Sequence, residues 1–299
     1  MNIGAKTRQL WAGRSISQEH RAVKHIYRPV RFYATVFATT WTCWFAAILL
    51  DEEALKTIAL MLGLLAPSIT AICMVFTSGD KELKQDFREK LIGLYRLNPR
   101  VIVAAIGLFF SIVVISIVVS TFFGFPLSQL SFAEGFSFEG PGLASALLTI
   151  LLASVVEEVG WRGYGEDAIA QYHTWFKESI IFGCVWALWH APLFLIPGTY
   201  HHGLTELGPL FAFNFFVSTI PFGFLTTWVY VKSNRSMLAS ILFHLFVNLA
   251  QEKVALMPET KCIETFVVVA AAVVIVLANK DMFFETRHIG KLPNRHIVG

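Results

Sequence analysis

Eight predominantly apolar runs take up most of this sequence, and each approaches the length that a helix needs to cross a lipid bilayer. A hydrocarbon core about 30 Å thick requires roughly 20 helical residues. Only 15% of the 299 residues are charged, whereas a soluble chain carries charge on about a quarter of its residues. The sequence therefore predicts an all-α fold, a polytopic membrane helix bundle of about eight transmembrane helices. The predicted spans are residues 32–50, 58–77, 101–123, 143–162, 179–196, 209–231, 237–250 and 263–278.

These runs divide the chain into three parts. Residues 1–31 are basic and lack an apolar core, so they do not form a cleavable signal peptide. Residues 32–278 are expected to form a single transmembrane domain, with its polar motifs concentrated in residues 143–250. Residues 279–299 are expected to be a cytoplasmic tail.

The distribution of basic residues predicts which side of the membrane each end occupies. If the N-terminus is cytoplasmic, 21 of the 24 lysines and arginines lie on the inner side, and only Lys56, Lys253 and Lys261 lie outside. Cytoplasmic loops carry an excess of lysine and arginine. We therefore expect an integral membrane protein with both termini in the cytoplasm.

Two segments between the spans have the pattern of helices that lie on a membrane surface. They are residues 80–97 and 164–176, and a cytosolic connector packed on its neighbours would show the same pattern. Both interpretations stay open. The apolar faces comprise Leu83, Phe87, Leu91 and Leu94 in the first segment, and Tyr164, Ala168, Tyr172, Trp175 and Phe176 in the second.

The fourth span ends in the stretch "LLASVVEEVGWRGYGEDA", which carries two adjacent glutamates into an apolar run. Glu158 and Arg162 are four residues apart, with the glutamate first, which is the favourable order for an ion pair on a helix. Glu157 is rotated by about 100° from Glu158 on a helix, so it can face a cavity while Glu158 is neutralised. The alternative is a helix end whose charged side chains reach back to the membrane surface.

Two further spans carry polar residues that favour a catalytic site. The fifth has His190 one turn after Trp186, and Pro192 is expected to disturb the helix there. The seventh has His244 and Asn248 four residues apart on one face. Polar residues inside a membrane are costly and usually face the bundle interior.

Glutamate, histidine and asparagine together can hydrolyse a peptide bond. A glutamate and a histidine can activate water, and a histidine and an asparagine amide can donate to an oxyanion. The sequence has no GxSxG motif for a nucleophilic serine and no HExxH motif for zinc. By ligand type, Glu157, His190 and His244 could also hold a metal, although we expect no cofactor.

The motifs Glu157-Glu158-x-x-x-Arg162, Trp186-x-x-x-His190 and His244-x-x-x-Asn248 resemble those of the CPBP family. This family contains CAAX proteases and bacteriocin-processing enzymes and is also called the Abi family. The flanking "EEVGWRGYG" is similar to its bacterial branch, which favours a bacterial plasma membrane. The second motif usually begins with phenylalanine, and here it begins with Trp186.

The resemblance implies an eight-helix intramembrane endopeptidase with a cavity open to the cytosol. It implies that Glu157 and His190 activate water and that His244 and Asn248 form the oxyanion hole, with Glu158, Arg162 and Trp186 in supporting positions. The implied substrate is a peptide or membrane protein, with or without a lipid group, and no nucleic acid partner is expected. The alternatives are a transporter or proton and ion relay, and an immunity or scaffold protein of the same fold.

Overall fold

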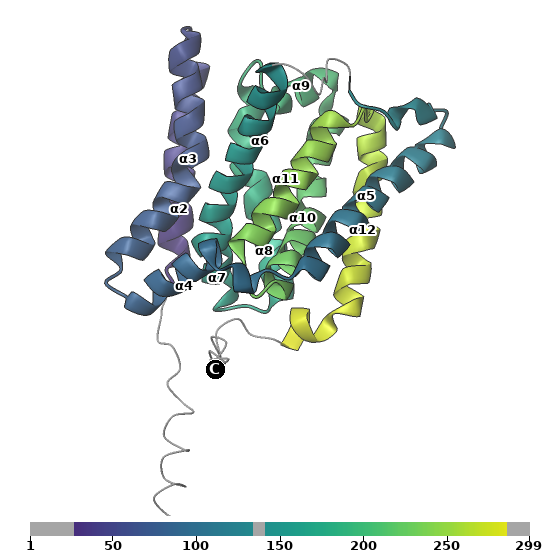
Figure 1. Cartoon of the computed structure of the whole chain (residues 1–299). Helices are drawn as coiled ribbons and strands as arrows, with labels where there is room; N and C mark the ends of the chain where they lie inside the picture. The colour runs from purple at the N-terminus through teal and green to yellow at the C-terminus, as the bar shows by residue number, and fades with distance from the viewer. Residues whose placement is uncertain (1–26, 134–140, 286–299) are drawn as a thin grey trace, which may run out of the picture.

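The computed structural model describes residues 27–133 and 141–285, which form a bundle of helices (Figure 1). Most of the predicted basic segment 1–31 and of the tail 279–299 lies outside these residues. The α-helices are α2 (Pro29–Ile48), α3 (Glu53–Thr77), α4 (Lys81–Ile92), α5 (Pro99–Thr121), α6 (Pro141–Gly160), α7 (Glu166–Ala170), α8 (Trp175–Trp189), α9 (Tyr200–Leu207), α10 (Pro209–Lys232), α11 (Met237–Lys253) and α12 (Pro258–Ala278). The short 3-10 turns are η1 (Leu94–Arg96), η2 (Leu127–Gln129) and η4 (Ala191–Leu195), and the π-helical turns are η3 (Trp161–Gly165) and η5 (Asp281–Glu285).

Each predicted span coincides with a helix of the described chain, and Pro192 ends α8 as expected. Within the described residues, five segments are long and apolar enough to cross a membrane, namely α3, α5, α8 with η4, α10 and α12. The other three spans correspond to α2, α6 and α11. Of these, α11 has only 17 residues, and α6 ends among the charged residues of the glutamate motif.

Large apolar side chains cover the outside of the bundle. Val103 and Phe110 of α5 are 70% and 60% exposed, and Phe266 and Val274 of α12 are 77% and 64% exposed. An apolar outer surface of this extent suits contact with lipid rather than water. Together with the spans, it confirms the prediction of a polytopic helical membrane bundle.

Several helices begin where the sequence supplies a helix-starting residue. Proline occupies the first position of α2, α5, α10 and α12, at Pro29, Pro99, Pro209 and Pro258. At that position the missing N–H costs nothing and the fixed φ angle suits a helix. The Asp80 side chain caps α4 by accepting hydrogen bonds from two backbone amides.

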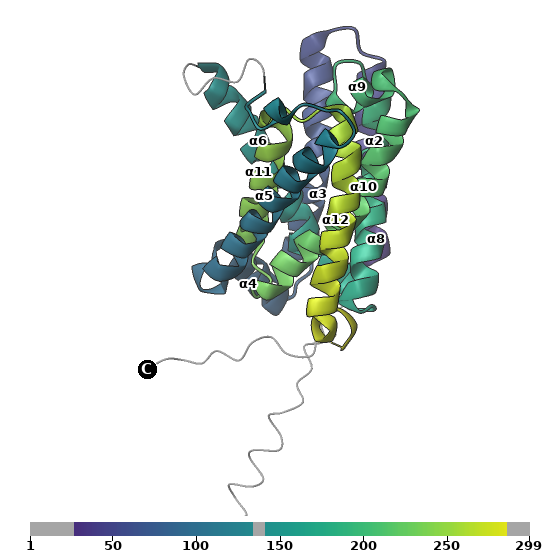
Figure 2. The same ribbon diagram turned by 90° about the vertical axis from the view of Figure 1, so that its right-hand side faces the viewer.

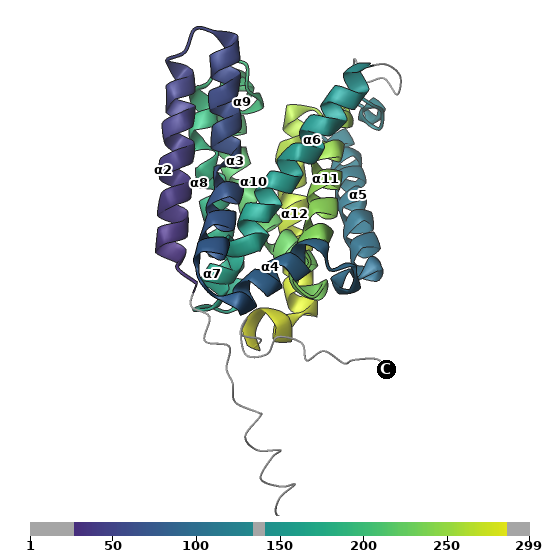
Figure 3. The same ribbon diagram turned by 60° about the vertical axis from the view of Figure 1, so that its left-hand side comes forward.

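The bundle has two distinct ends, which Figure 1 shows at the bottom and the top. The basal end carries α4, α7 and η5, and both described ends of the chain lie there. The distal end carries α9 and the connection between α11 and α12. Viewed from the side, α5 and α12 lie together (Figure 2), and α2 and α3 form a pair on the opposite flank (Figure 3).

Glycines bring two pairs of helices into backbone contact. A Cβ atom added to Gly160 would stand 2.4 Å from the Cβ of Pro67, so α6 meets α3 without an intervening side chain. A Cβ added to Gly223 of α10 would stand 2.9 Å from the carbonyl oxygen of Ser179 and 3.2 Å from the Cα of Gly183, both in α8. These contacts fix α6 against α3 and α10 against α8.

Residues 164–176 form a packed connector, so the interpretation as a surface helix is wrong for this segment. The π-helical turn η3 continues α6 directly into α7, and Tyr164 and Ala168 are 3% and 0% exposed. Trp175 is also buried and begins α8, and among the five residues of the predicted apolar face Tyr172 alone is well exposed, at 62%. The periodicity shows that the segment has an apolar face, but it does not show whether lipid or protein covers that face.

Residues 80–97 fold as α4 followed by η1, and the helix buries some of its charged side chains as well as its apolar ones. Leu83 and Phe87 are each 3% exposed, as the apolar pattern predicts. Leu94 is 69% exposed because α4 has already ended at Ile92. The charged face is not free, because it contributes to a cluster of buried ionic side chains at the basal end.

This basal charge cluster consists of Asp86, Lys90, Arg96, Asp167 and Arg235. Asp86 lies 3.0 Å from Arg96 and 2.8 Å from Arg235. Asp167 pairs with Lys90 at 2.7 Å and also with Arg235. The cluster therefore ties α4, α7 and the turn before α11 together.

Lys90 connects this cluster to the π-helical turn. Its ammonium group is fully buried and donates to the carbonyl oxygens of Arg162 at 3.0 Å and of Gly163 at 2.9 Å. The Tyr230 hydroxyl also donates to the Arg162 carbonyl, at 3.1 Å. These bonds satisfy backbone carbonyls within the π-helical turn and fix its position.

We expect Lys90→Met to destabilise the protein, because it leaves Asp167 and two carbonyl groups without the ammonium donor. Removing one partner of a buried ion pair typically costs about 3–5 kcal/mol. The melting temperature in detergent should fall clearly. The matched control is Lys81→Met on the exposed face of α4, and equal melting temperatures for the two variants would contradict the proposed clamp.

Candidate active site

A cavity of about 780 Å³ lies within the bundle, bordered by residues of α6, α8, α9, α10, α11 and α12. All four predicted catalytic residues and Trp186 line it, and they come from three separate helices. Glu158 and Arg162 do not line it. The five are Glu157, Trp186, His190, His244 and Asn248.

Trp186 lies at the centre of this group. Its indole Nε1 donates to the Oε2 atom of Glu157 at 2.9 Å. The indole ring lies 6.1 Å from the His190 ring and 5.6 Å from the His244 ring, measured between centroids. The tryptophan therefore orients the Glu157 carboxylate beside both histidines, which phenylalanine could not do because it has no N–H group.

The hydrogen bond of His190 determines which ring nitrogen is basic. Its Nδ1 atom lies 2.7 Å from the carbonyl oxygen of Trp186. Because a carbonyl only accepts, Nδ1 carries the hydrogen, and in the neutral ring Nε2 is left with a free lone pair. His190 is therefore suited to accept a proton.

His244 is held in a different way, by a carboxylate. Its Nδ1 atom lies 2.8 Å from the Oε1 atom of Glu158. A carboxylate at this position orients the ring and stabilises a protonated imidazole. His244 can then donate from Nε2, which suits it to bind a developing negative charge.

Asn248 lies one turn beyond His244 on the same face of α11 and also lines the cavity. One of its amide hydrogens points to the hydroxyl oxygen of Ser154, at 3.4 Å between nitrogen and oxygen. The amide carries a second hydrogen that can serve a bound group.

The two adjacent glutamates face different surroundings. Glu157 is 6% exposed and lines the cavity, whereas Glu158 is fully buried. The predicted pair exists, because Arg162 donates to Glu158 at 2.9 Å. Glu158 also holds His244, a contact between residues 86 positions apart that the sequence did not indicate.

Arg162 has a second acidic neighbour that sequence analysis missed. Glu166 lies 3.0 Å from its guanidinium, and a hydroxyl from Thr227 lies between Glu166 and Glu178. All three carboxyl groups around Arg162 are fully buried. The spacing of Glu166, four residues after Arg162, was the signal that could have revealed it.

His201 is another cavity residue that was missed. It lies in α9, and its ring stacks on His190 with 5.2 Å between centroids and 24° between planes. Because His201 lies in a connection between two predicted spans, the sequence did not indicate this contact.

No group of three or more histidines, cysteines, aspartates or glutamates within residues 27–133 and 141–285 is arranged to hold a metal ion. Glu157, His190 and His244 are instead oriented by hydrogen bonds to protein groups.

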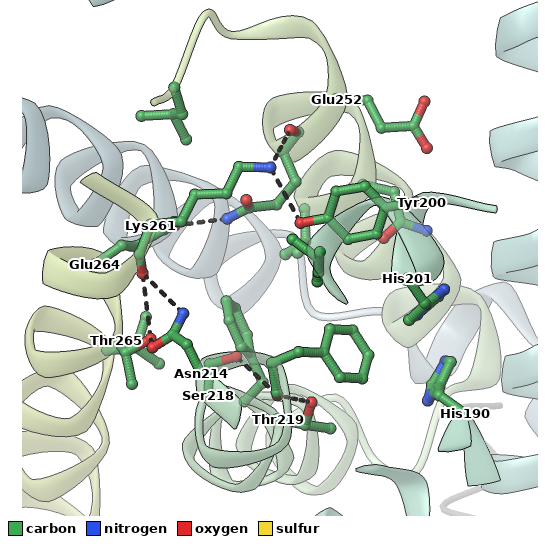
Figure 4. Close-up of a pocket in the computed structure, with 18 of the residues that line it drawn as sticks. His190, Tyr200, His201, Asn214, Ser218, Thr219, Glu252, Lys261, Glu264 and Thr265 are labelled. Carbon is green, nitrogen blue, oxygen red and sulfur yellow. Dashed lines mark hydrogen bonds between the residues drawn. The ribbon is translucent and has the colours of Figure 1, made fainter. Parts of the chain in front are cut away.

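The cavity opens toward the distal end. Tyr200 and Glu252, which are exposed, line it there, and His190 lies deeper (Figure 4). Both described ends of the chain, at Tyr27 and Glu285, lie at the opposite, basal end. The two expectations of cytoplasmic termini and of a cavity open to the cytosol therefore concern opposite ends of the bundle, and each stays a prediction.

The buried carboxyl groups around Arg162 make stability depend on pH. Burial raises the pKa of Glu166 from 4.5 to about 8, although Arg162 acts in the opposite direction. The folded chain therefore retains a proton that the unfolded chain has released, so stability falls as pH rises from about 4.5 to 8.

Glu166→Gln replaces this carboxyl with a neutral group and should weaken that dependence. We expect the melting temperature of the variant to fall less than that of the unmodified protein between pH 5 and pH 8. Glu206→Gln, at a position 71% exposed on α9, is the control and should follow the unmodified protein. Parallel pH profiles for Glu166→Gln and the unmodified protein would refute the assignment.

Comparison with known proteins shows which family the chain belongs to. Residues 139–250, which contain all three motifs, match the family described as type II CAAX prenyl endopeptidase Rce1-like. The chain is also 36% identical over 263 residues to CAAX prenyl protease 2 of Methanococcus maripaludis, an alignment that covers 87% of this chain and 97% of that protein. These similarities do not favour a transporter. The chain belongs to the Rce1-like CAAX prenyl endopeptidase family and is an intramembrane endopeptidase.

Proposed function

We propose that Glu157 and His190 activate a water molecule for attack on a peptide carbonyl. The observation that carries this proposal is the convergence of Glu157, His190, His244 and Asn248 on one cavity. The water gives its proton to the glutamate–histidine pair, and its oxygen bonds to the carbonyl carbon. The two bases are suited to this step because one is a carboxylate and the other has a free Nε2 lone pair.

His244 and Asn248 then bind the oxyanion of the tetrahedral intermediate. The Glu158 carboxylate at Nδ1 favours a protonated His244, whose Nε2–H donates together with an amide hydrogen of Asn248. When the intermediate collapses, the carbon–nitrogen bond breaks and the leaving amine takes the proton held by the glutamate–histidine pair.

Glu158, Arg162 and Trp186 are positioning residues in this proposal. Glu158 orients His244, Arg162 neutralises Glu158, and Trp186 orients Glu157. None of the three has to exchange a proton with the substrate.

We propose that the substrate is a peptide or membrane protein that carries a prenyl group. This extends to the present chain what the name of its Methanococcus maripaludis relative states. The cavity wall supports it, because aromatic side chains at Phe211, Phe215 and Phe222 line the space beside the polar groups. An apolar lining of this kind suits a lipid chain.

Glu157→Gln and Glu158→Gln should have different effects. Glu157→Gln keeps the size of the side chain but removes a base, so we expect normal folding and a loss of about 10²–10⁴-fold in cleavage rate. Glu158→Gln removes the charge that balances Arg162 and holds His244, so it should lower both the melting temperature and the activity.

The two variants are measured together for thermal stability and for cleavage of a prenylated peptide. Glu53→Gln, at the exposed start of α3, serves as the control and should behave as the unmodified protein. An active Glu157→Gln enzyme would disprove the mechanism. An equal loss of stability in both glutamate variants would instead indicate two charges with a structural role.

We also propose that the chain lies in a bacterial plasma membrane with both termini in the cytoplasm. The distribution of basic residues supports this orientation, because 21 of the 24 lysines and arginines are on the inner side of the predicted topology when the N-terminus is cytoplasmic. A topology reporter fused after Gly299 should then report a cytoplasmic location, and the cavity would open toward the outer side. A reporter active outside the cell would reverse the orientation and direct the cavity mouth to the cytoplasm.

A further inference from the structure

His201, in α9, contacts a proposed catalytic side chain but has no part in the proposed mechanism. The rings of His201 and His190 lie 5.2 Å apart between centroids, and their planes differ by 24°. Rings separated by about 4.5–7 Å attract each other when they stack with an offset. Figure 4 shows the two rings one above the other in the cavity, with His190 the deeper of the two.

The place of His190 in the chain gives its ring little local support. The residue lies between the last residue of α8, Trp189, and the first residue of η4, Ala191. Its Nδ1–H donates to the Trp186 carbonyl at 2.7 Å. One hydrogen bond fixes one edge of the ring, but the χ2 torsion of a histidine is broad, so the plane of the ring can still rotate. Packing against the faces of the ring has to hold that plane.

His201 supplies this packing in a way that the other neighbouring rings do not. The rings of Trp189 and Phe215 meet His190 nearly edge-on, at 76° and 75°. The Trp186 ring is tilted by 56° and its centroid is 6.1 Å away. Among these four ring contacts of His190 in the described chain, the contact with His201 is the one closest to parallel.

The position of His201 is itself well determined. The Thr199 side chain caps α9 by accepting a hydrogen bond from the His202 amide at 3.1 Å, and its hydroxyl lies 2.7 Å from the Leu193 carbonyl oxygen in η4. The Phe215 ring packs edge-on against His201, with 4.7 Å between centroids. The start of α9 is therefore tied to the turn that directly follows His190.

His201 is suited to act as a neutral ring. Burial, and then the nearby His190, hold the pKa of His201 well below its usual value of 6.5. Its ring nitrogens have no hydrogen-bond partner among the residues that the structure describes. A neutral ring without such partners acts through its shape and its stacking surface rather than through charge.

We propose that His201 is a positioning residue whose ring holds the imidazole of His190 in the orientation in which it acts as a base. This inference rests on the proposed function, which assigns the role of base to His190. The connection between α8 and α10 would then belong to the active site, and His190 would be fully supported only while α9 is seated on η4.

The test measures cleavage of a prenylated peptide by the full-length variants His201→Ala and His201→Phe. His201→Ala removes the stacked ring, so we expect kcat to fall by up to about 10²-fold, the cost of displacing a reacting group by about 1 Å. KM and the melting temperature should change little. His201→Phe keeps an aromatic ring at this position and should retain most of the activity.

His202→Ala is the matched control. This histidine is the next residue of α9, its side chain is 25% exposed, and it is not among the residues that line the cavity. The variant should cleave the peptide as the unmodified protein does.

A second measurement follows the Nδ1 proton of His190 and needs no cleavage. A ring proton held in a hydrogen bond to a carbonyl exchanges slowly and gives a separate downfield signal in the ¹H NMR spectrum. The signal is assigned by its absence in His190→Gln. We expect it in the unmodified protein and in His201→Phe, and we expect it to be broadened or lost in His201→Ala.

An unchanged kcat in His201→Ala would overturn the proposal. An inactive His201→Phe with a normal melting temperature would also overturn it, because the ring nitrogens would then take part in the chemistry. The expected NMR changes without cleavage by the unmodified protein would support the positioning role and refute the proposed function. Equal cleavage by all variants, with an unchanged NMR signal, would support the proposed function and refute the positioning role.

Discussion

The buried guanidinium of Arg162 is the group on which the arrangement of the site depends. A cation enclosed among helices requires partners, and here they are the carboxyl groups of Glu158 and Glu166. Glu158 in turn holds His244, so the position of a cavity histidine on α11 is set by a charge at the end of α6. From the other side, Lys90 and Tyr230 hold the backbone carbonyl of Arg162. One continuous set of contacts therefore joins the basal charge cluster to the cavity.

The two adjacent glutamates have different roles, and a single carboxylate could not fill both. A base must be open to water, whereas a counter-ion for a buried arginine must be enclosed. Rotation by about 100° between neighbouring residues of a helix places Glu157 on the cavity wall and Glu158 in the interior. Trp186 completes the separation, because it directs Glu157 toward His190 and His244.

Local patterns predicted the helices and the Glu158–Arg162 pair, because both depend on residues within a few positions of each other. The bonds from Trp186 to Glu157 and from Glu158 to His244 join residues 29 and 86 positions apart. No periodicity contains such information, so the sequence predicted residues that line one cavity but not their mutual orientation. For the segment 164–176 the sequence left a surface helix and a packed connector open, because protein and lipid both cover apolar faces.

The backbone contacts made by glycine also limit how this enzyme can move. Gly160 rests directly on Pro67, and Gly223 rests directly on α8, so neither pair of helices has a layer of side chains that could slide or rotate. The helix that carries Glu157 and the helix that ends at His190 are therefore each held against a neighbouring helix. Any widening that admits a bulky chain would have to come from parts without such anchors, above all α9 and the α11–α12 connection at the distal end. Different parts of the bundle would then admit the substrate and hold the catalytic groups in place.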